Sequence, residues 1–225
     1  MGRRALTVAV TTATLGATLG AASADAPSPV VGASELVAGR SYTDWEIAWT
    51  RWVAAQPASG SSGDARCITA NQRGPVWFLS PEGRADDHVI TARCSIPASS
   101  YLMLGVPAVE CTDVYRVPGF PSTARGLRRC ARKYWRRYGD PRPRIVLDGT
   151  PLTPGGVRVA PPAFSVRMPA DDNIFGAPGQ TRATVALVAA PLLLRPLSPG
   201  PHKLVDAVRY RGTFDRVVIY RLTVG

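Results

Sequence analysis

The sequence predicts a mostly β protein: a single antiparallel β-sandwich, immunoglobulin-like or jelly-roll-like, with two α-helices packed on its surface and disulfide bonds. Three observations predict this fold class. The 225 residues are 45% apolar, as a globular core requires, and they include 21 prolines and 21 glycines, many of them in the second half. Short apolar runs between such residues are typical of strands joined by turns. Four cysteines indicate two disulfides.

The first 24 residues have the pattern of a secretory signal peptide. Arg3 and Arg4 precede a weakly apolar run. The run ends in Ala22, Ser23 and Ala24, the pattern of small residues at which a signal peptidase cleaves. This pattern predicts export, with a processed chain that begins at Asp25 and is secreted or associated with the cell wall. Residues 25–40 show no periodicity and are expected to be a flexible lead-in, and residues 41–225 form one predicted domain.

An aromatic helix is expected at the start of that domain. Thr43 and Glu46 match a capping box, with Thr43 as the N-cap. Trp45, Trp49 and Trp52 then recur at helical spacing and share one face. Such a stripe could stack on sugars, but packing against a sheet is the favoured interpretation.

Strands dominate the rest of the chain. Asp148 and Gly149 predict a tight hairpin turn. The apolar runs predict strands at residues 76–79, 89–96, 101–106, 144–147, 157–160, 163–167, 181–188, 192–195, 203–209 and 215–224.

A second helix is expected over residues 122–139, with Gly139 as its C-terminal stop. Its apolar residues share one face, and the remaining positions are almost all basic. The chain carries a formal net charge of +11, which favours association with anionic surfaces. Arg129, Arg132 and Arg136 are therefore candidate contacts to an anionic cell-wall polymer or a membrane surface. The alternative is a solvated outer face of a docked helix.

The cysteines are expected to pair as Cys67–Cys94 and Cys111–Cys130, because sequential pairs close short loops. The sequence lacks a Cys-x-x-Cys motif and contains only two histidines, so no metal site and no cofactor are predicted. His88, beside Asp86 and Asp87, could hold a cation or act as a base, and His202 could serve a serine triad. Roles in a solvated loop and in a turn are favoured for these two histidines.

Catalytic signatures are sparse. The sequence has no nucleophile elbow, no glycine-rich phosphate loop and no nucleic-acid-binding module. Glu110 follows an apolar run, with Asp113 two positions beyond Cys111. Paired with Asp148 or Asp172, Glu110 could act as an acid or base on a glycoside, which requires two carboxyl groups.

Three stretches carry a resemblance to a known family. Residues 71–79 (NQRGPVWFL), 93–97 (RCSIP) and 197–202 (LSPGPH) resemble a family of secreted bacterial proteins with an aromatic N-terminal helix. The resemblance covers residues 42–225 and implies no activity, and relatives often have Gly-Gln in place of Asn71-Gln72. Together these features predict a non-catalytic extracellular or cell-wall-associated binding module. The alternatives are a glycan-acting hydrolase that uses Glu110 and a structural envelope protein.

Overall fold

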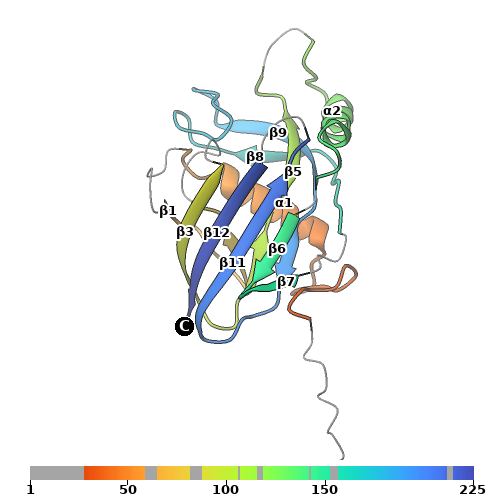
Figure 1. The fold of residues 1–225 in the computed structure, drawn as a ribbon. Helices are drawn as coiled ribbons and strands as arrows, with labels where there is room; N and C mark the ends of the chain where they lie inside the picture. The colour runs from red at the N-terminus through yellow and green to blue at the C-terminus, as the bar shows by residue number, and fades with distance from the viewer. Residues whose placement is uncertain are drawn as a thin grey trace, which may run out of the picture.

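A computed structural model describes residues 28–58, 65–81, 88–105, 107–115, 119–141, 143–152, 157–211 and 215–225. The predicted signal peptide lies outside these residues. Two helices and twelve strands are described, and most of them are visible in Figure 1. In chain order the elements are α1 (Tyr42–Ala54), β1 (Ala65–Arg66), β2 (Val76–Leu79), β3 (Val89–Ile96), β4 (Tyr101–Leu104), β5 (Ala108–Thr112), α2 (Ala124–Arg137), β6 (Pro143–Leu147), β7 (Thr150–Leu152), β8 (Phe164–Arg167), β9 (Arg182–Ala189), β10 (Leu192–Leu194), β11 (Gly200–Arg209) and β12 (Asp215–Val224).

The expected mostly β fold with two helices is confirmed, and its strands form three sheets. The sheets are not purely antiparallel as expected, because β3 pairs in parallel with β1 and β12, and β2 pairs in parallel with β4. The largest has the order β1-β3-β12-β11-β6-β7, so the last two strands of the chain lie at its centre. Strands β6 and β7 are joined by the predicted hairpin, in which Asp148 and Gly149 both have positive φ (49° and 82°). This left-handed conformation suits the two-residue turns that match strand twist. The segment 157–160, expected as a strand, contributes only an isolated bridge from Val159 to Ala189.

A small central sheet, β10-β4-β2, is covered on both faces. Alternate residues of β4 show this: Leu102 and Leu104 belong to the core beneath the six-stranded sheet, and Met103 to the core around α1. All three are fully buried. The uninterrupted apolar runs of these strands follow from that double burial, since a strand with one solvated face would alternate with polar residues.

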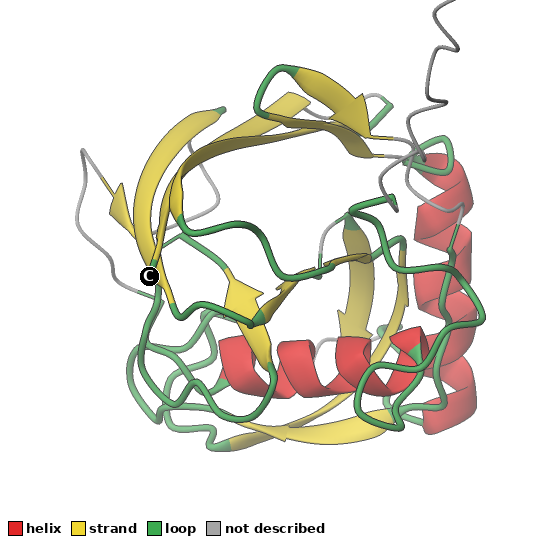
Figure 2. Ribbon diagram, turned by 90° about the horizontal axis from the view of Figure 1, so that it is seen from below, coloured by secondary structure: helices red, strands yellow, loops and turns green. Residues whose placement is uncertain are grey.

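Helix α1 lies between sheets and not on the surface as expected (Figure 2). Its stripe of Trp45, Trp49 and Trp52 is buried, and each indole N–H donates to a backbone carbonyl, which confirms packing over sugar stacking. Trp49 lies so close to Gly105 that a Cβ there would be 2.2 Å from the indole ring. The expected cap at Thr43 is wrong. Ser41 caps α1, in a capping box with Asp44.

The third sheet, β5-β9-β8, separates the two helices. One face packs on α1 through Val185 and Leu187, and the other packs on α2 through Ala186 and Val188. Figure 1 shows α2 at the outside of this sheet, beside β9 and β5. The molecule is therefore layered as six-stranded sheet, central sheet, α1, third sheet and α2.

The residues expected as a flexible lead-in are anchored from Ser28 onward. Val31 is fully buried, and its amide donates to the Leu193 carbonyl at 3.0 Å. Arg195 forms an ion pair with Glu35 at 2.6 Å, which fixes the same segment to the end of β10. Helices α1 and α2, of 13 and 14 residues, are both too short to cross a bilayer, as a span needs about 20 apolar residues.

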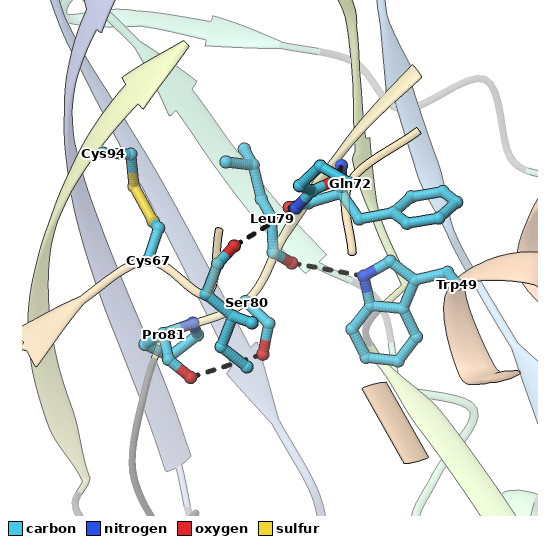
Figure 3. Close-up of a disulfide and its surroundings, with 9 residues drawn as sticks. Trp49, Cys67, Gln72, Leu79, Ser80, Pro81 and Cys94 are labelled. Carbon is cyan, nitrogen blue, oxygen red and sulfur yellow. Dashed lines mark hydrogen bonds between the residues drawn. A yellow bond between two sulfur atoms is a disulfide. The ribbon is translucent and has the colours of Figure 1, made fainter. Parts of the chain in front are cut away.

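Both expected disulfides are present. Cys67, just after β1, is bonded to Cys94 of β3, and Cys111 of β5 is bonded to Cys130 of α2. Figure 3 shows the first of them beside the end of β2, where the Trp49 indole donates to the Leu79 carbonyl at 3.2 Å. The second disulfide attaches α2 covalently to the sheet beneath it.

Candidate functional site

Two regions of the structure carry unusual concentrations of charge: the outer face of α2 and the protein interior next to β5. Helix α2 begins at its N-cap Thr123, whose hydroxyl accepts from the Gly126 amide at 3.2 Å, and it ends before Gly139, whose φ is +80°. Its apolar face packs against β5 and β9 through Leu127, Cys130, Ala131 and Trp135, which are all buried.

The opposite face of α2, called here the cationic face, contains the three arginines predicted as ligand contacts. Arg129, Arg132 and Arg136 are exposed, and no described residue forms an ion pair with them. Like charges one turn apart destabilise a helix by about 0.2–0.5 kcal/mol per pair, so this face lowers helix stability. Its members are Arg125, Arg128, Arg129, Arg132, Lys133, Arg136 and Arg137.

The interior region starts from Glu46 on α1. Because α1 is capped at Ser41, Glu46 lies in the second turn and turns inward with Trp49 and Thr50. Glu46 is completely buried. The nearby Thr50 hydroxyl acts to lower the pKa of its carboxyl, but the two side chains do not reach good hydrogen-bond geometry with each other or with another described residue. Such a group costs about 1–3 kcal/mol when unsatisfied.

Glu110 is the electrostatic neighbour of Glu46. Burial, followed by repulsion from Glu110, holds the pKa of the Glu46 carboxyl well above its usual range. Glu110 lies on β5, and its residue surface is exposed, yet the protein around it still raises its pKa through burial. The Glu110 carboxyl therefore retains its proton to a higher pH than an ordinary Glu does.

Asp206 of β11 is a second buried carboxyl on the inner face of the six-stranded sheet. Asp206 lies opposite Val218 of β12. Arg216 is two residues before Val218 on β12, so its side chain is on the same inner face of the sheet. Burial, opposed by the attraction of Arg216, raises the pKa of Asp206 to about 7. Asp206 Oδ1 and Arg216 Nε have no hydrogen-bond partner among the described residues.

Tyr210 connects the two interior groups. Burial raises its pKa to about 12, and the charges that act on it include Arg216, Asp206 and Glu110. The charges of Arg216, Asp206 and Glu110 therefore all act on this one tyrosine.

Two acidic residues that were expected to pair with Glu110 form hydrogen bonds with other groups. Asp113 Oδ1 accepts from the Thr184 amide at 2.7 Å and extends the pairing of β5 with β9. Asp148, in the β6–β7 turn, accepts from the Lys203 amide at 2.8 Å through Oδ1 and contacts His202 Nδ1 at 2.6 Å through Oδ2. Neither residue contributes to the pKa of Glu110, and the carboxyl coupled to Glu110 is Glu46.

His202 is part of a Ser–His–Asp arrangement with Ser198 and Asp148, but its hydrogen bonds exclude a general base. Nε2 is 2.8 Å from the Ser198 carbonyl oxygen and 3.4 Å from its hydroxyl. A carbonyl only accepts, so Nε2 carries a proton, and Nδ1 donates to Asp148. Burial opposes the charged form, but these hydrogen bonds and the Asp148 charge together raise the His202 pKa. His202 fastens the turn at residues 198–202 to the β6–β7 hairpin.

The remaining candidates give no site. Asp86 and Asp87, expected beside His88, lie outside the described residues. Asp172 lies in the loop before β9, where its carbonyl accepts from the Ala58 amide at 3.0 Å. Within the described ranges, no three His, Cys, Asp or Glu side chains are grouped as metal ligands.

Sequence reasoning found the cationic face and Glu110 and missed Glu46, Asp206 and Arg216. The position of Asp206 could have been predicted, because it is two residues from both Leu204 and Val208 and therefore on the same inward side of β11. Glu46 was missed because it was assigned to a cap. Searches against protein-family models, curated proteins and solved structures give no match to the chain.

Proposed function

We propose that this protein is a non-catalytic binding module of the cell exterior that attaches to an anionic wall polymer through the cationic face of α2. The observation that carries the proposal is a 14-residue helix with seven exposed cations, no acidic residue and no ion pair to the described chain. At about 1.5 Å per residue the face is about 21 Å long, enough to contact several repeats of a linear polymer.

A polymer fits the cationic face better than a membrane does. An amphipathic helix binds a bilayer by inserting its apolar face. In α2 that face is buried against β5 and β9 and is fixed there by the Cys111–Cys130 disulfide. What remains for a partner is charge alone, and arginine binds phosphate and carboxylate groups in bidentate geometry.

An extracellular location supports the same proposal. Disulfides persist in oxidising compartments and are rare in reducing ones. The pattern of residues 1–24 predicts export to such a compartment. In this proposal the six-stranded sheet and the central sheet, which share one core, are the two layers of the predicted β-sandwich.

Replacing Arg129, Arg132 and Arg136 together with Gln tests the proposal. The triple variant should bind immobilised polyphosphate more weakly than the parent at low salt, and its melting temperature should be unchanged or higher, since repulsion is relieved. The matched control replaces Arg73, Arg167 and Arg182, which are exposed and lie off α2. Equal binding by both triple variants would refute a role for α2.

Glycan hydrolysis centred on Glu110 is a second candidate function, favoured by the coupling of Glu110 to Glu46. Glu110 would be the proton donor, because its raised pKa retains the proton. Glu46 has no exposed surface, so it would not contact the substrate itself. Release of reducing ends from wall glycan by the parent and Asp113→Asn, but not by Glu110→Gln, would support this candidate. Equal release by all three would rule it out.

A further inference from the structure

Two glutamates from different elements face each other between α1 and the third sheet. On β5, Val109 and Cys111 pack against α2, and successive side chains of a strand point to opposite faces. Glu110 therefore lies on the face that packs against α1, opposite Leu187 in register. Glu46 of α1 lies near it, since the Glu110 charge contributes to the raised pKa of Glu46.

The packing of α1 holds Glu46 close to the beginning of β5. Trp49, one turn after Glu46, lies against Gly105, and Gly105 comes shortly before β5 begins at Ala108. Thr50 is four residues after Glu46, so the two side chains are neighbours on one side of the helix. Glu46 and Thr50 are 0% and 2% exposed. Two polar side chains of α1 are thus enclosed beside β5.

No positive group of the described chain balances the two carboxyls. The Glu46 oxygens reach no described residue in hydrogen-bond geometry, and the ion pairs among the described residues involve other acids, namely Glu35, Asp140 and Asp148. Cations are not scarce, since the chain has 27 lysines and arginines against 16 acidic residues. A buried carboxylate without a counter-charge is strongly unfavourable, and a like charge nearby adds to the cost. A cation from outside the chain would satisfy both glutamates.

We propose that Glu46, Thr50 and Glu110 bind a calcium ion. Their donor atoms are all oxygens, and carboxylate and hydroxyl oxygens suit hard cations, whereas thiolate and imidazole groups suit zinc and copper. Calcium accepts flexible geometries and mixed shells of carboxylates, neutral oxygens and water, whereas magnesium requires a nearly ideal octahedron. The two carboxyls and the hydroxyl supply part of the calcium shell, and water supplies the rest.

The site would connect two layers of the fold. One carboxyl comes from α1 and the other from β5, so the ion links the helix to the third sheet. The unfolded chain does not bring these residues together, so calcium should stabilise the folded protein. With two carboxylates, we expect a Kd of about 10⁻⁴–10⁻³ M, the range of extracellular calcium modules. Polymer binding by α2 plays no part in this site.

Thermal melts of the chelator-treated protein in increasing CaCl₂ test the site. The parent should melt a few degrees higher at about 10 mM CaCl₂. It should also bind Tb³⁺, which replaces calcium in oxygen sites and is excited through a nearby indole, here that of Trp49. Glu46→Gln and Glu110→Gln should each weaken calcium binding by about tenfold or more. Asp113→Asn is the matched control, because it removes the same charge next to β5 from a side chain that is bound to the Thr184 amide.

Loss of the calcium response in both Gln variants, with a normal response in Asp113→Asn, supports the site. A parent whose melting temperature is unchanged by calcium overturns it, and so does an equal response in the parent and in either Gln variant. An equal response to MgCl₂ also refutes it, since that would be a general effect of divalent salt. Glu110→Gln decides the outcome if Glu46→Gln does not fold, because residue 110 is exposed.

Discussion

At the scale of single residues, the buried carboxyl of Asp206 contributes to the expected response to pH, together with that of Glu46. In the folded protein its pKa is raised to about 7, whereas an Asp in the unfolded chain titrates near 3.8. The folded state therefore holds a proton that the unfolded state has lost. Stability should fall as pH rises from about 4 to about 7, by up to roughly 4 kcal/mol.

The variant Asp206→Asn isolates this effect. It removes the titrating group, so we expect it to melt above the parent at pH 8 and close to the parent at pH 4. Thermal melts of both proteins across this range measure the difference. Parallel pH profiles for the parent and Asp206→Asn would mean that the Asp206 carboxyl is better solvated than its surroundings indicate.

At the scale of elements, the docking of α2 depends on Trp135. This side chain is 3% exposed and completes the core between α2 and the third sheet, as the helical spacing predicted. Trp135→Ala should lower the free energy of unfolding by roughly 3–5 kcal/mol. Trp135→Phe should lower it less, since the indole N–H that is lost has no partner among the described residues. Denaturant titrations give both values, and an Ala variant as stable as the parent would place the helix face outside the core.

The sequence predicts the positions of helices and turns where a local pattern specifies them. It does not predict which strands pair with each other. The apolar face of α2 and the Asp148-Gly149 turn follow from spacing and turn chemistry. The cap of α1 does not, because two overlapping segments fit the capping-box pattern and the burial of Tyr42 selects the earlier one. The interior position of Glu46 depends on that choice. The register of β1, β3, β12 and β11 in the six-stranded sheet is likewise not specified by any local pattern.

At the scale of the whole molecule, two disulfides cross-link neighbouring elements: one joins the end of β1 to β3, and the other joins β5 to α2. They close loops between cysteines 27 and 19 positions apart. In the chain-entropy model each stabilises the fold by about 3–4 kcal/mol. Replacing Cys111 and Cys130 with Ala should lower the free energy of unfolding by about that amount, measured in denaturant. The Cys67 and Cys94 double variant is the comparison, and four free thiols in protein made under oxidising conditions would contradict both pairings.

The central place of β11 and β12 in the six-stranded sheet bears on how the chain acquires its structure. Strand β12 pairs with β3 across more than half of the sequence, and β11 pairs with β6 on its other side. Strands β3 and β6, which flank β12 and β11, come earlier in the chain, but they do not pair with each other, and each needs a partner from the last 26 residues. Long-range pairing of this kind slows folding. The six-stranded sheet therefore cannot be completed until β11 and β12 are available, whereas the strands of the other two sheets all precede residue 195.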